Sequence, residues 1–124
     1  MKIVQTSKAP KPIGPYSQGV VEGGFVFTSG MVAIDPETSK VVSGGIREQT
    51  RRVLENVKAI LEEAGSSMQK VTKTTVYLKE QSYFKEMNQV YARYFRDHKP
   101  TRSTIVCDFM LSDVLVEIDV IAKA

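Results

Sequence analysis

The chain has 124 residues, of which 42% are hydrophobic and 25% are charged. This length and these fractions of hydrophobic and charged residues predict one globular domain spanning residues 1–124, with no second domain. The net charge is +3, and because the 17 basic residues are interspersed with 14 acidic ones, the charge gives little support for nucleic-acid binding.

The first third of the chain is predicted to be extended and turning. Residues 8–19, KAPKPIGPYSQG, hold three prolines and two glycines, so this segment should pack without forming a strand ladder. Residues 19–34 are typical of two short strands that turn at Gly23 and Gly24, and residues 35–40 of a turn.

An amphipathic helix is predicted from Gly45 to Ala64, stopped by Gly65, because apolar residues recur there at intervals of three and four. Residues 70–80 are rich in β-branched side chains and predict a strand. We expect Ser82 to cap a second helix that Pro100 ends. Its buried stripe is Tyr83, Met87, Val90, Tyr91 and Tyr94.

Two further strands are predicted at 102–109 and 114–124, joined by residues 110–113. The order β-β-α-β-α-β-β predicts an α+β fold in which both helices cover one face of a mixed sheet. Alternation in the last strand places Val114, Val116, Ile118 and Val120 on that face. The other face carries Leu115, Glu117, Asp119 and Ile121, a mixture that predicts cover by a partner subunit.

Several classes of site lack their usual sequence support. The chain has no G-x-S-x-G, P-loop or G-x-G-x-x-G pattern. His98 lies in a polar stretch, where it is expected to be solvated or capping. Cys107 is the only cysteine, so no intrachain disulfide is possible, and with a single histidine no zinc site or other metal cofactor is expected.

Arg102 has two interpretations. It is either an edge-strand charge that discourages sheet pairing or a bidentate clamp for a ligand carboxylate, which requires a sheltered position. Glu117 is either a half-solvated strand residue or, with Arg102 on an adjacent strand, a group that activates water. Asp119 is expected to pair with a basic residue of a partner chain. Tyr16 and the glycines near it and at Gly30 indicate either a ligand-approach segment or ordinary turns.

The location is predicted to be cytoplasmic and away from membranes. No apolar run approaches the roughly 18 residues that span a bilayer, and residues 1–14 lack the apolar core of a signal peptide.

Five stretches, in order, resemble the RidA family of reactive enamine/imine deaminases: IGPYSQGV, FTSGMVAIDPET, NVKAILEEAG, VTKTTVYLKE and PTRSTIVCDF with VEIDVIA. The resemblance implies a chorismate-mutase-like fold, a barrel-like homotrimer and sites between subunits. It also implies cofactor-free hydrolysis of 2-aminoacrylate, 2-iminobutanoate and 2-iminopropanoate to 2-oxo acids and ammonia.

The same resemblance implies roles for six residues. Arg102 binds the substrate carboxylate and Glu117 orients or activates water. The remaining residues, which line the pocket or contribute contacts near it, are Tyr16, Gly30, Asn88 and Thr104.

Three features depart from many members: Thr104 stands in place of cysteine, Met31 in place of glutamine, and the connection at 96–102 is short. Alternatives to deamination are a regulatory trimer that binds small carboxylates without turnover, and an endoribonuclease or translation inhibitor. Chaperone activity, attributed to some members, has no signature in the sequence.

Overall fold

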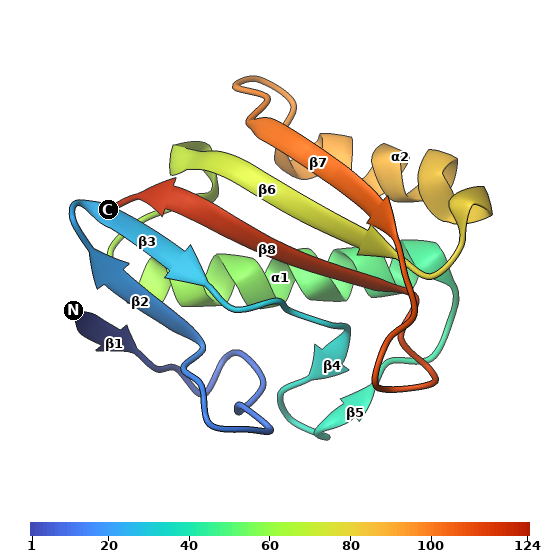
Figure 1. Cartoon of the computed structure of the whole chain (residues 1–124), viewed down its shortest axis with the longest axis horizontal. Helices are drawn as coiled ribbons and strands as arrows, with labels where there is room; N and C mark the ends of the chain where they lie inside the picture. The colour runs from blue at the N-terminus through green and yellow to red at the C-terminus, as the bar shows by residue number, and fades with distance from the viewer.

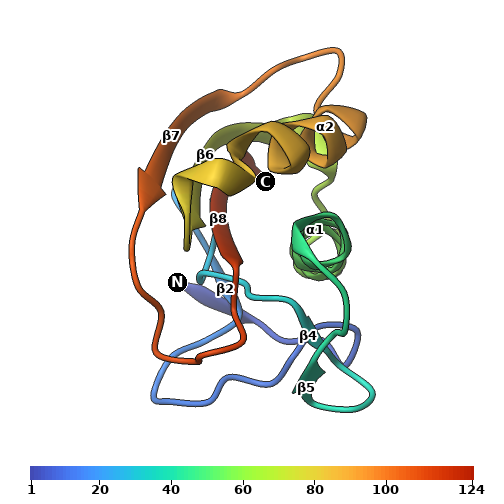
Figure 2. The same cartoon turned by 90° about the vertical axis from the view of Figure 1, so that its right-hand side faces the viewer.

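The computed structural model describes all 124 residues as one mixed sheet with two helices on one face (Figures 1 and 2). The six-stranded sheet has the order β1-β2-β3-β8-β6-β7. Only β6 and β7 run parallel, and every other neighbouring pair is antiparallel. The sheet strands are β1 (Lys2–Val4), β2 (Gly19–Glu22), β3 (Phe25–Thr28), β6 (Val71–Leu78), β7 (Thr101–Val106) and β8 (Val116–Lys123).

The predicted α+β fold is confirmed, and the structure adds three short strands that were not predicted. β1 precedes the proline-rich segment, and β4 (Ile34–Asp35) pairs with β5 (Lys40–Val41) around the predicted turn. The β2–β3 turn lies at Gly23 and Gly24, whose φ angles of 57° and 84° explain the need for glycine. No helix is long and apolar enough to cross a bilayer.

The first helix, α1 (Ile46–Glu63), lies within one residue of the predicted bounds at each end. Gly45 is its N-cap, where the Glu48 carboxylate accepts a hydrogen bond from the Gly45 amide at 3.0 Å. Gly65 follows the helix with φ 82°, as its stop position predicts.

The bounds predicted for the second helix were wrong at both ends. Ser82 lies inside a short 3-10 turn, η2 (Gln81–Tyr83), so α2 (Phe84–Tyr94) begins after it. The helix also ends at Tyr94, six residues before Pro100, because the next residue, Phe95, has non-helical angles of φ −125° and ψ 44°. A second 3-10 turn, η1 (Met68–Lys70), precedes β6.

The core lies between the helices and the sheet face that carries Val116, Ile118 and Val120, all buried as predicted. The opposite face of the sheet is bare of any element of the chain in Figure 2. It exposes Ile3, Phe25, Phe27 and Ile105, whereas Glu117 and Asp119 are half-buried.

Candidate functional site

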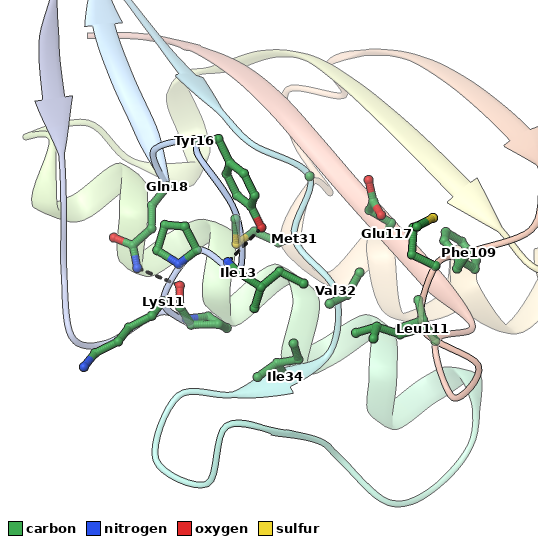
Figure 3. A pocket seen from close by; sticks show the side chains of 15 residues that line it. Lys11, Ile13, Tyr16, Gln18, Met31, Val32, Ile34, Phe109, Leu111 and Glu117 are labelled. Atoms are coloured by element: carbon green, nitrogen blue, oxygen red, sulfur yellow. Dashed lines mark hydrogen bonds between the residues drawn. The ribbon is translucent and has the colours of Figure 1, made fainter.

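A pocket of about 170 Å³ lies where three connecting segments meet the beginning of strand β8 (Figure 3). Its walls come from residues 10–18, from 30–34 and from 109–114, and Glu117 closes one side. Figure 3 shows Glu117 and Phe109 on one side of the pocket and Tyr16 and Ile13 on the other. The sequence-predicted residues Tyr16, Gly30 and Glu117 are therefore brought together.

Glu117 is a half-buried carboxylate that makes no ion pair within the chain. Burial raises the pKa of Glu117, and the neighbouring charge of Asp119 raises it further. A carboxyl group with a raised pKa is suited to exchange protons with a ligand, which is the property that acid–base chemistry requires.

Gly30 gives the Glu117 carboxylate the space that it occupies. A Cβ at position 30 would lie 2.8 Å from Cδ of Glu117, closer than real Cβ contacts come. Glycine is needed at this position because of close approach, since its φ is not positive. The Tyr16 hydroxyl accepts a hydrogen bond from the Ile13 amide at 3.3 Å, and Tyr16 is 46% exposed at the pocket.

Arg102 and Asn88 form a second cluster, the Arg102 cluster, at the edge of the sheet beside α2. The Arg102 Nη1 donates to Asn88 Oδ1 at 2.8 Å. Its Cζ lies 4.8 Å from the ring centroid of Tyr91 and 5.6 Å from that of Phe84, so the guanidinium is held against two aromatic rings. Thr104 follows two residues later and faces the same side of β7.

The predicted adjacency of Arg102 and Glu117 was wrong. Strand β6 lies between β7 and β8, and Arg102 is in register with Thr74, whose side chain is buried under α2. Glu117 is in register with Tyr77, which belongs to the opposite face. The two residues therefore project from opposite faces of the sheet, and one chain does not unite them in one site.

Asp119 lies on the same face as Glu117 but outside the pocket. Burial raises its pKa, while the Tyr77 and Thr75 hydroxyls and the Lys73 ammonium act against that shift. Its pairing with a partner chain stays a prediction. His98 packs edge-on against the Phe95 ring, with centroids 5.8 Å apart, away from both clusters.

Three buried amides were missed by the sequence interpretation, although each one fixes a segment of the pocket wall. Gln18 donates to the carbonyls of Ala9 and Pro10. From α1, Asn56 donates to the carbonyls of Val32 and Ile34, and Gln49 bridges the Asp113 carbonyl and the Leu115 amide. For Gln49 and Asn56, the available signal was a polar residue on the apolar stripe of α1.

Residues 6–124 match the family model described as Endoribonuclease L-PSP. The chain belongs to the RidA family. A RutC family protein of Pyrococcus abyssi is 52% identical over 121 residues, which are 98% of this chain and 95% of the relative. Among solved structures, a Rid family protein of Yersinia pestis, YyfA, is 38% identical with a TM-score of 0.95 and covers 99% of this chain and 98% of its own.

A second RidA-like structure is relevant to ligands. TdcF of Escherichia coli, solved with bound serine, is 40% identical with a TM-score of 0.93, and the match covers all of this chain and 99% of TdcF.

Within this RidA fold, the three departures occupy different places. Met31 is a lining residue of the pocket, Thr104 lies two residues from Arg102 on the same face of β7, and the short connection between α2 and β7 carries Lys99 at φ 44°.

Proposed function

We propose that this RidA protein forms homotrimers whose intersubunit sites hydrolyse 2-imino acids and their enamine tautomers. The substrates proposed are 2-aminoacrylate, 2-iminobutanoate and 2-iminopropanoate, and the products are 2-oxo acids and ammonia. The observation that carries the proposal is Glu117: a half-buried carboxylate with a raised pKa and no cationic partner within the chain, at the wall of a pocket.

The bare sheet face supports assembly. It exposes four large apolar side chains beside two half-buried carboxylates, and monomeric proteins rarely leave such a surface uncovered. Arg102 lies on the edge strand β7, the strand best placed to meet a neighbouring copy. A second chain would bring its Arg102 to the Glu117 pocket of the first and so complete a site.

In such a site, the guanidinium of Arg102 would bind the substrate carboxylate. Asn88 accepts a hydrogen bond from Nη1, and the guanidinium carries further N–H donors that could form a bidentate pair. The serine bound to TdcF supports the idea that this fold accepts ligands shaped like amino acids.

Glu117 would then act on water at the imine carbon. The carboxylate takes a proton from water as the oxygen bonds to the protonated imine carbon, and the C=N electron pair moves onto nitrogen. Glu117 returns the proton to nitrogen, the C–N bond breaks, and the hydroxyl proton leaves as the carbonyl forms. A 2-oxo acid and ammonia result, with one proton released for the one that the iminium brought. A positioned acid–base group accelerates such a reaction by about 10²–10⁴-fold.

The proposal is tested with imines generated in situ by an amino-acid oxidase and trapped by semicarbazide. Wild type should lower the amount of semicarbazone, and Glu117→Gln should lose about 10²–10⁴-fold in kcat. The control is Glu37→Gln, an exposed carboxylate outside the pocket, which should retain turnover. Wild type that matches buffer alone would overturn deamination.

The main rival is a trimer that binds small carboxylates without turnover. Such a trimer would also bind carboxylates through Arg102, but it would not require the Glu117 carboxylate. Binding of pyruvate that needs Arg102, without imine hydrolysis, would favour this rival.

The family description raises endoribonuclease activity as another candidate. Binding of single-stranded RNA through phosphates weakens steeply with salt, so a salt titration with a labelled oligonucleotide tests it directly. Cleavage that survives Glu117→Gln would identify a separate activity.

A further inference from the structure

Arg102 is a half-buried charged side chain that no carboxylate of its own chain holds in place. The ion pairs of the chain join Met1 to Glu22 and Arg47 to Glu86, so neither includes Arg102. Its guanidinium is contacted instead by the Asn88 amide oxygen and by two aromatic rings. These groups are uncharged, so the positive charge of Arg102 is left for a ligand.

The three contacts come from one side of α2, since Phe84, Asn88 and Tyr91 are spaced by four and then three residues. Arg102 on β7 is in register with Thr74 on β6, and Thr74 is buried beneath the same helix. Figure 2 shows α2 beside β6. The helix therefore faces the side of the sheet from which Arg102 projects.

Tyr91 is the most firmly held of these three residues. It is 8% exposed, whereas Phe84 is 43% exposed. The Tyr91 hydroxyl shares a hydrogen bond of 2.7 Å with the hydroxyl of the fully buried Thr74. The Phe95 ring packs against the Tyr91 ring, with centroids 4.7 Å apart. The Tyr91 ring, whose centroid lies 4.8 Å from Cζ of Arg102, is thus fixed before any ligand binds.

An uncharged contact suits a residue that must bind an anion. A carboxylate beside Arg102 would hold the guanidinium strongly but would compete with the ligand for the same N–H groups. Burial raises the pKa of Tyr91 above its ordinary value of 10.0, although the Thr74 hydroxyl and the charge of Arg102 act against that shift. The Tyr91 hydroxyl therefore stays protonated at neutral pH and does not compete.

A fixed ring also reduces what ligand binding costs. A mobile arginine loses rotamer freedom when it is immobilised on a ligand, and this loss weakens binding by about 2- to 10-fold. A guanidinium that already rests on a fixed aromatic ring has lost much of that freedom in the empty site.

From this geometry we propose that Tyr91 is a positioning residue, whose ring holds the Arg102 guanidinium where the substrate carboxylate binds it. The inference rests on the proposed function, in which Arg102 binds that carboxylate, and deepens it. Since the carboxylate is bound alike in the ground state and the transition state, Tyr91 should affect KM and leave kcat almost unchanged.

The test compares Tyr91→Leu, which removes the ring, with Tyr91→Phe, which keeps the ring and removes only the hydroxyl. Tyr91→Leu should raise KM for the imine and Kd for pyruvate by about tenfold. Its kcat should stay within about twofold of wild type. Tyr91→Phe should keep both constants near the wild-type values, because a phenyl ring makes a similar contact with a cation.

The matched control is Tyr94→Leu. Tyr94 belongs to the same helix, but its hydroxyl donates to Glu55 of α1 at 2.9 Å, and its ring makes no contact with the guanidinium of Arg102. Tyr94→Leu loses a tyrosine ring and a hydrogen bond of similar length, so a general loosening of α2 would appear in both leucine variants. Unchanged KM and Kd are expected for Tyr94→Leu.

A measurement on the ligand-free wild type needs no folded variant of Tyr91. The Nε–H group of Arg102, identified by its absence from the Arg102→Lys spectrum, should have an NMR order parameter near about 0.85. A value below about 0.6 would show a mobile side chain and overturn the inference.

The outcomes separate the inference from the proposed function. Imine hydrolysis by wild type with unchanged KM and Kd in Tyr91→Leu, or equal effects in Tyr91→Leu and Tyr94→Leu, overturns the positioning role and leaves deamination standing. Wild type without hydrolysis overturns deamination, while pyruvate binding that weakens in Tyr91→Leu alone still supports the positioning role. Pyruvate binding that survives Arg102→Ala overturns the positioning role, because Arg102 then binds no carboxylate.

Discussion

Arg102 and Glu117 project from opposite faces of one sheet, with β6 between their strands. Because neither residue reaches the other within a chain, any site that uses both must join two copies. In the proposed assembly, each chain would therefore contribute two separate half-sites, one around Arg102 and one around Glu117.

This division predicts complementation between inactive variants. Arg102→Ala and Glu117→Gln should each be inactive alone, because every site lacks one group. Unfolding and refolding them together in equal amounts should restore about a quarter of the wild-type activity, since random assembly unites an intact Arg102 with an intact Glu117 at that frequency. Mixing without subunit exchange serves as the control. Absence of recovery in verified mixed trimers would place the complete site within one chain.

Glu117 should cost stability at neutral pH. Its folded-state pKa is raised, mainly by burial, so the folded protein favours the protonated form more than the unfolded chain does. Its unfavourable contribution is absent below the ordinary carboxyl pKa of 4.5 and develops as pH rises through the raised value. Glu117→Gln should therefore have a higher Tm than wild type at pH 7 and an equal Tm near pH 4. Exposed Glu37→Gln should show no such pH-dependent difference. A lower Tm for Glu117→Gln at pH 7 would contradict the burial argument.

Gly30→Ala should remove activity while the fold persists. The new Cβ would overlap the Glu117 carboxylate and push it from its place, and displacement by about 1 Å costs roughly 10²-fold in rate. Gly45→Ala provides the comparison, because a Cβ there meets only Glu48 Oε2 at 3.9 Å and φ is −101°. Imine hydrolysis and circular dichroism of both variants make the measurement. Full activity in Gly30→Ala would show that Glu117 does not act from its observed position.

Asn56→Leu should weaken the fold by leaving two pocket-wall carbonyls without their donor. Asn56 is fully buried, and an unsatisfied buried polar group costs about 1–3 kcal/mol. Urea unfolding gives the free energy of unfolding, with the exposed Gln69→Leu as the control for added apolar surface. Unchanged stability would mean that water replaces the amide at Val32 and Ile34.

Local patterns in the sequence predicted the parts of the fold that depend on local geometry. The spacing of Val53, Val57 and Ile60 located α1, and alternation placed Ile118 in the core and Glu117 on the opposite face. The prediction that Ser82 caps the second helix was wrong because a 3-10 turn, η2, precedes α2. Single-residue preferences do not distinguish the start of a 3-10 turn from the start of an α-helix.

The separation of Arg102 from Glu117 was not accessible to the same reasoning. Alternation assigns a face within one strand, but the insertion of β6 between β7 and β8 is a property of long-range pairing. The roles of Gln49 and Asn56 were hidden for a related reason. Their partners, near residues 113 and 32, are remote in sequence and come together only in the folded chain.

The two amides on α1 also make the pocket wall dependent on the helix that supports it. Residues 32–34 and 113–115 are mostly outside regular strands, yet they can separate from the body only when their hydrogen bonds to Asn56 and Gln49 break. Segments of this kind ordinarily fray early, whereas here the Leu115 amide should exchange its hydrogen as slowly as the interior of α1. The entrance of the pocket would then be open at all times, so that ligand binding would not require a loop to open first.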